Sequence, residues 1–181
     1  TINQLLQTPG RQVQSVAQAS FDAWVKYYRI NENSPNATVS YYGKGALVAL
    51  CLDLTLRAEG HSNLDAVMRA LMQRCAGGPM RESDLLAVLK QLGKRRYDAE
   101  LREWVHGTGE LPLAELLQRH GLQWLQEPEP LAQRLGLRVN ESSGLTIKNV
   151  LRGTAAEAAG LAAGDEWLAV ELPPAGPGAQ A

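Results

Sequence analysis

The sequence predicts an α+β protein in which a mainly helical array precedes a small β-rich module. Apolar residues recur at helical spacing as far as Gly121, with short connections between the segments. The prolines of the run EPEP at 127–130 then mark a boundary, since proline removes a backbone donor and biases its neighbour away from helix. We expect a helical domain at 1–126, a module at 127–172 and a disordered tail at 173–181.

Five helices are expected within the helical domain. The segment Gly45–Ala58 carries leucines on every side, which predicts a buried helix rather than a surface one, and Gly60 would end it. Capping residues, glycines and prolines bound the other four. These are expected at Leu64–Cys75, Glu82–Leu92, Asp98–Val105 and Pro112–Gly121.

The module after the boundary is rich in β-branched residues. The runs LGLRVNE and GLTIKNVL, divided by SSG, are typical of two strands with a turn between them. The run TAAEAAG predicts a short helix with Thr154 as its cap, and DEWLAVEL at 165–172 predicts a further strand. About 50 residues is short for an independent domain.

Charge and composition exclude several classes of partner. A net charge of -1 argues against nucleic acid, which attracts a basic surplus, and the run KRR at 94–96 is interpreted as a solvated face. No apolar run reaches the roughly 18 residues of a membrane span.

The two cysteines, Cys51 and Cys75, are expected to be buried free thiols. They favour a reducing compartment, and we expect a cytoplasmic location.

The three histidines do not suggest a metal or catalytic site. His61, His106 and His120 each adjoin a glycine that would end a helix, and no H-E-x-x-H motif is present. We expect capping or surface roles for them. The motif G-x-S-x-G and a glycine-rich phosphate loop are absent too.

Two adjacent tyrosines, Tyr41 and Tyr42, stand just before a Gly-Lys-Gly step that opens the most apolar helix. A phenol at a helix start can donate a hydrogen bond to an oxyanion without carrying charge at neutral pH. The alternative is an aromatic pair that packs over the helix start. Composition alone favours packing.

The residues Y-G-K-G-A at 42–46 resemble a segment of the gluzincin zinc aminopeptidases, in which the tyrosine of Y-x-K-G stabilises the transition-state oxyanion. Longer runs are similar to the glycyl aminopeptidase family, gluzincin metallopeptidases with a C-terminal PDZ domain. These runs are TPGRQVQSVAQASFDAWVKYYR, NENSPNATVSYYGKGALVALCLDLTLR and WVHGTGELPL. The resemblance extends from about Ile2 to about Val170, and the Y-x-K-G spacing selects Tyr42 rather than Tyr41 as the catalytic residue.

The resemblance implies a bacterial zinc-dependent aminopeptidase that removes small N-terminal residues such as Gly. The helical region would belong to its thermolysin-like catalytic unit. The zinc ligands of the family, an H-E-x-x-H pair and a downstream Glu, would lie upstream of Thr1, so no metal ligand is assigned in this chain. The run TINQLLQ, which has no capping signal, agrees with a start inside a helix. The isolated chain is then expected to bind no zinc and to be inactive.

The β-rich module resembles a PDZ domain. The segment Leu135, Gly136, Leu137, Arg138 and Val139 is similar to the carboxylate-binding loop and strand, and G-L-x-x-G-D occurs at 160–165. Such a loop captures a peptide C-terminus, and the strand edge adds the peptide as another strand. An ordinary strand and turn is the alternative. A PDZ domain continues with a strand and a second helix where this chain has PPAGPGAQA, which leaves the completeness of the groove open.

Two functions therefore remain after the sequence analysis. The first is the C-terminal part of an aminopeptidase with a peptide substrate and a possible peptide C-terminus as partners. The second is a non-enzymatic peptide-binding or scaffold protein that carries a PDZ-like module. An H-E-x-x-H motif encoded upstream of Thr1 would favour the first.

Overall fold

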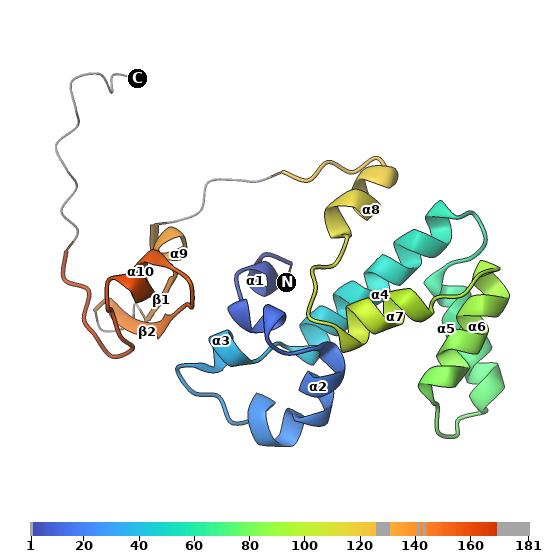
Figure 1. The fold of residues 1–181 in the computed structure, drawn as a ribbon, viewed down its shortest axis with the longest axis horizontal. Coiled ribbons are helices and arrows are strands. Elements are labelled where there is room, and N and C mark those ends of the chain that lie inside the picture. Colours follow the sequence, from blue (N-terminus) through green and yellow to red (C-terminus); the bar gives the residue numbers. More distant parts are fainter. Residues whose placement is uncertain (1, 126–130, 141, 143, 170–181) are drawn as a thin grey trace. The chain divides into compact units, whose positions relative to one another are not determined.

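The computed structural model describes residues 2–125, 131–140, 142 and 144–169 (Figure 1). The chain divides into two compact units, residues 1–129 and 130–181, and each is described by itself. The predicted boundary after residue 126 and the predicted tail at 173–181 lie outside the described residues. No described helix is long and apolar enough to span a bilayer.

The first unit is helical, as the sequence predicts. Its α-helices are α1 (Ile2–Leu6), α2 (Val16–Phe21), α3 (Ser34–Ala37), α4 (Tyr41–Ala58), α5 (Leu64–Cys75), α6 (Glu82–Gly93), α7 (Asp98–Leu101) and α8 (Leu113–Arg119). A 3-10 turn η1 (Pro9–Gln12) and two π-helical turns, η2 (Ala23–Tyr27) and η3 (Arg102–His106), complete it.

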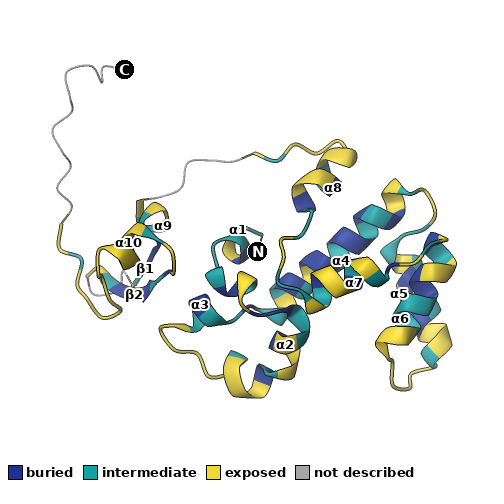
Figure 2. Cartoon of the chain, viewed as in Figure 1, coloured by how far each residue is buried: buried dark blue, intermediate teal, exposed yellow. Residues whose placement is uncertain are grey.

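Helix α4 is the central element of this unit. It contacts α1, α2, α5, α8 and η3, and its buried residues lie on more than one side (Figure 2). The predicted buried helix is therefore confirmed. It begins four residues earlier than predicted, because the Ser40 hydroxyl caps it by accepting a hydrogen bond from the Gly43 amide at 3.1 Å.

The next two helices pack as a pair. The Asn63 side chain caps α5 by accepting a hydrogen bond from the Ala66 amide at 2.9 Å, as the sequence predicts. In α6, the Asp84 carboxylate accepts a hydrogen bond from the Arg81 amide at the helix start and pairs with Arg74 of α5 at 2.8 Å. The predicted helices at 64–75 and 82–92 are thereby confirmed.

The last part of this unit departs from the prediction in two ways. The helix expected at 98–105 is a short α7 followed by the π turn η3, which buries Trp104. The helix expected from Pro112 starts at Leu113, because Pro112 has a ψ of 44° that lies outside the helical region. It ends at Arg119, two residues before Gly121.

The second unit holds a small two-stranded sheet. Its elements are α9 (Leu131–Leu135), β1 (Leu137–Asn140), β2 (Thr146–Val150) and α10 (Ala155–Ala158). The strands β1 and β2 pair antiparallel with an irregularity between Arg138 and Val139. Leu137, Ile147 and Ala156 form the buried centre of this unit.

Two predictions for the second unit need correction. The strand expected at 165–172 is only an isolated bridge between Glu166 and Thr146 in its described part, because only residues 165–167 bond to β2 and its neighbour Leu145. Thr154 stands at the start of α10, but its hydroxyl donates to the Leu151 carbonyl at 2.6 Å instead of capping the helix.

The two thiols differ in exposure. Cys51 is fully buried, and burial raises its pKa to about 11, whereas Cys75 is only partly buried, contrary to the prediction. Since the thiolate is the nucleophile, we expect iodoacetamide to modify Cys51 at least about a hundredfold more slowly than Cys75 at pH 8. Peptide mapping by mass spectrometry measures both rates, and the unfolded chain, in which the rates should converge, is the control. Equal rates in the folded chain would contradict the burial of Cys51.

Candidate functional site

Four tyrosines gather at the start of α4. Tyr27 and Tyr28 come from the end of η2, and Tyr41 and Tyr42 form the first turn of α4. The ring centroids of Tyr41 and Tyr42 lie 4.2 Å apart, and the Tyr27 ring lies 5.2 Å from Tyr41 and 6.1 Å from Tyr42. The hydroxyls of Tyr28 and Tyr41 lie 3.4 Å apart. The aromatic packing that the sequence left open is therefore present, in a cluster larger than the adjacent pair.

Within this cluster Tyr42 is the most exposed tyrosine, and Tyr28 is exposed as well. Tyr42 is 62 % exposed, whereas Tyr41 is partly buried against the helical core. Hydrogen bonding from Tyr41, and then from Tyr28, lowers the pKa of Tyr42, while hydrogen bonds to Tyr28, and then to Tyr42, raise the pKa of Tyr41. A phenol that receives hydrogen bonds is polarised, which makes it a better donor. Tyr42 is thus an accessible hydrogen-bond donor whose pKa lies below its usual value.

Large apolar side chains lie exposed in the segment just before the Tyr42 turn. The ring of Trp24 stacks on Tyr28 with centroids 5.2 Å apart, which joins this segment to the tyrosine cluster. A high density of exposed apolar groups is typical of a surface that meets another molecule or domain. The exposed residues are Phe21, Trp24, Val25, Tyr28 and Ile30.

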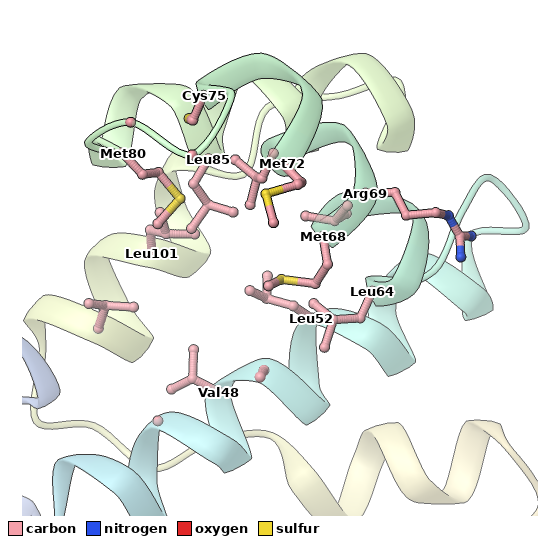
Figure 3. A pocket seen from close by; sticks show the side chains of 17 residues that line it. Val48, Leu52, Leu64, Met68, Arg69, Met72, Cys75, Met80, Leu85 and Leu101 are labelled. Carbon is pink, nitrogen blue, oxygen red and sulfur yellow. The ribbon is translucent and has the colours of Figure 1, made fainter.

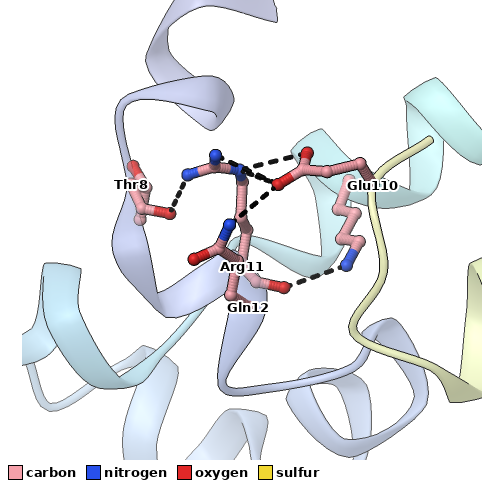
Figure 4. Close-up of polar contacts among 5 residues, drawn as sticks. Thr8, Arg11, Gln12 and Glu110 are labelled. Atoms are coloured by element: carbon pink, nitrogen blue, oxygen red, sulfur yellow. Dashed lines mark hydrogen bonds and ion pairs between the residues drawn. The ribbon is translucent and has the colours of Figure 1, made fainter. Parts of the chain in front are cut away.

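A polar cluster lies on the buried side of the α4 start. The Lys44 ammonium, 2 % exposed as a residue, donates to the Arg11 carbonyl at 3.1 Å. The Arg11 guanidinium pairs with Glu110 at 3.1 Å, and the Gln12 amide donates to the same carboxylate at 3.1 Å (Figure 4). Desolvation lowers the pKa of Lys44, and the charge of Glu110 opposes that shift. Three segments of this unit therefore meet at Lys44: the residues after α1, the start of α4 and the loop before α8.

The first unit also contains an apolar pocket, which lies between α4, α5, α6 and α7 (Figure 3). Its volume is about 670 Å³, and its lining includes Met68, Met72 and Met80 together with the Cys75 thiol. Arg69 is the only charged residue of this lining. The pocket holds no acid or base pair suited to catalysis, so the candidate site remains the one around Tyr42.

The described residues hold no group of three His, Cys, Asp or Glu side chains that could bind a metal. His61 is exposed. The His106 ring pairs with Glu82 at 2.6 Å, and the His120 ring hydrogen-bonds to the Leu54 carbonyl at 2.9 Å. These positions fit the surface and helix-end roles that the sequence suggested.

The candidate peptide-binding residues lie around the start of β1. Leu135 ends α9, Gly136 has a φ of +81°, and Leu137, Arg138 and Val139 belong to β1. The Gly136 amide donates to the Gln133 carbonyl at 3.0 Å, so it is not free for a carboxylate in this conformation. The Gly136 carbonyl accepts from Leu151 at 2.8 Å. Among the described residues, β1 pairs with β2 alone.

Sequence reasoning missed most residues of the site, among them Tyr28, Lys44 and Glu110. Tyr28 stood in a run used for the resemblance, but nothing in its spacing placed it beside Tyr42. Lys44 carried a usable signal, because a cation that opens an apolar helix must find an acceptor once it is buried. Glu110 had no signal, since its link to Arg11 spans 99 positions of sequence.

The model of the M61 glycyl aminopeptidase family matches residues 1–48. The matched segment includes Tyr42 and Lys44 and ends within α4. It confirms the resemblance to this family over that segment and supports a peptidase-related function. Comparisons with curated proteins and with solved structures gave no match.

Proposed function

We propose that this chain is the C-terminal part of a zinc-dependent aminopeptidase that removes small N-terminal residues such as Gly. The observation that carries the proposal is Tyr42, an exposed phenol with a lowered pKa at the start of the buried helix α4. It lies inside the segment that matches the M61 family model. Its role would be to donate a hydrogen bond to the oxyanion that develops on the scissile carbonyl.

The described residues do not fit a zinc site, because no three suitable ligands come together among them. We therefore propose that the zinc ligands belong to residues outside this sequence and that the isolated chain is inactive. The part of the reaction assigned to this chain is the hydrogen bond from Tyr42. The zinc chemistry is not assigned to any residue of the described ranges.

The test uses the full-length gene product and the isolated chain side by side. We expect the full-length protein to bind about one zinc per polypeptide and to release glycine from a glycyl anilide. The isolated chain should bind no zinc and release no glycine. A leucyl anilide, whose side chain is large, is the matched control for a preference for small residues. Full-length protein that binds no zinc and cleaves neither anilide would contradict the proposal.

A peptide-binding role for the second unit is a second candidate, suggested by the resemblance of residues 135–139 to the peptide-binding loop and strand of a PDZ domain. A peptide could extend the sheet there by pairing with the β1 backbone. This role is compatible with either the peptidase or a non-enzymatic scaffold. If the full-length protein binds peptide C-termini yet has no zinc and no cleavage activity, the scaffold function would replace the peptidase.

A further inference from the structure

Lys44 occupies a position that neither helix stability nor solvation explains. It lies in the first turn of α4, where the helix dipole disfavours a cation, and burial disfavours the charge further. Its ammonium reaches back to the Arg11 carbonyl at 3.1 Å, across 33 positions of sequence. The nearby Glu110 carboxylate favours the charged form of Lys44. Because this buried charge destabilises its own helix, we expect its role to lie in the contacts that it makes with other segments.

The contact joins the turn that carries Tyr42 to the neighbouring turn η1. Two further contacts hold η1 close to the segment before α4. A Cβ added at Gly10 would lie 2.1 Å from the Thr38 carbonyl oxygen, and the Val39 amide donates to the Gln14 side chain at 3.2 Å. The first turn of α4 thus packs against η1.

We propose that Lys44 is a positioning residue for Tyr42. The bond from its ammonium to the Arg11 carbonyl fixes the first turn of α4 against η1, and this fixes the direction of the Tyr42 phenol two residues earlier. The inference rests on the proposed function, because it concerns the same oxyanion contact. Glu110 supports it by holding Arg11 and by compensating the Lys44 charge.

The test compares Lys44→Met, Tyr42→Phe and the double variant in the full-length peptidase. Misplacing a catalytic group by about 1 Å costs up to about a hundredfold in rate, so Lys44→Met should lower kcat tenfold to a hundredfold and change KM little. In the Tyr42→Phe background the same change should cause no further loss, because Lys44 acts through Tyr42. Lys44→Arg keeps a buried cationic donor and should recover part of the rate.

Lys90→Met replaces an exposed lysine of α6 and is the matched control, with no expected change in kcat. If Lys44→Met does not fold, Glu110→Gln replaces it in the cycle, since the amide keeps an acceptor but loses the charge that faces Lys44. It should show a smaller fall in kcat that is again absent with Tyr42→Phe. The positioning role would be overturned if these variants kept full kcat, or if they lost equal activity with Tyr42 and with Phe at position 42. In that case Tyr42→Phe alone would still lower kcat, and the catalytic role of Tyr42 would stand. If Tyr42→Phe kept full kcat, the catalytic role of Tyr42 would be wrong, and the positioning role of Lys44 would be wrong with it.

Discussion

If the proposed function is right, Tyr42→Phe in the full-length gene product is expected to lower kcat on the order of a hundredfold and to leave the zinc content unchanged. The substitution removes only the hydroxyl. The ring can keep its place beside Tyr41, where the centroids lie 4.2 Å apart. Since the lost hydrogen bond would form mainly in the transition state, KM should change little. Glycine release from a glycyl anilide and metal analysis on the same preparations give the two quantities.

Tyr41→Phe is the matched control for this prediction. Tyr41 is the adjacent phenol, but it is partly buried and only one of the two neighbours that hydrogen-bond to Tyr42. Its loss should therefore lower kcat by only a few-fold, through a weaker polarisation of Tyr42. If Tyr41→Phe removed most of the activity and Tyr42→Phe did not, the assignment from the Y-x-K-G spacing would be wrong.

The largest expected loss of stability follows Tyr97→Ala. The Tyr97 ring is fully buried, its hydroxyl donates to Glu59, and the Arg95 guanidinium lies 3.9 Å from its ring centroid. Removing a buried aromatic ring costs about 3–5 kcal/mol through lost burial and the cavity left behind. The substitution also takes a donor from Glu59, which keeps its pair with Arg95 at 2.8 Å. Thermal unfolding of the isolated chain, followed by circular dichroism, should show a Tm lower by on the order of 10 °C.

Two comparison variants separate the causes of this loss. Phe21→Ala removes a ring of similar size that is 90 % exposed, and it should change stability by no more than about 0.5 kcal/mol. Tyr97→Phe removes only the hydrogen bond to a charged acceptor and should cost about 1.5–3 kcal/mol. A Tm for Tyr97→Ala within about 2 °C of the original chain would mean that the ring does not support the core.

The helices that the sequence predicts well are those with strong local signals. Helix α5 carries its own cap in Asn63, and α4 is so uniformly apolar that only a buried position suits it. One prediction that failed depended on a partner distant in sequence. The strand expected at 165–172 needed a continuous partner edge, and in the described residues β2 supplies only the bridge from Thr146 to Glu166.

The candidate site likewise combines a local sequence motif with contacts between residues distant in sequence. Within the family resemblance, the Y-x-K-G spacing predicts Tyr42 rather than Tyr41 as the catalytic residue, and the family match over residues 1–48 includes that motif. The exposure of Tyr42 and the hydrogen bonds that lower its pKa depend on Tyr28 and Tyr41, whose hydroxyls meet only after η2 folds against α4. The contact of Lys44 with Arg11 likewise forms only when η1 packs beside α4.

The sequence by itself determined the mainly helical first unit and the buried central helix, because periodicity and caps are local properties of the chain. Only the tertiary structure decided which tyrosines are exposed, which groups compensate the Lys44 charge and that Tyr97 lies fully buried in the core. Those features arise from contacts across 13 to 99 positions of sequence, such as Tyr28 with Tyr41 and Arg11 with Glu110. Burial and the hydrogen bonds that compensate it are properties of the packed molecule and not of any one segment.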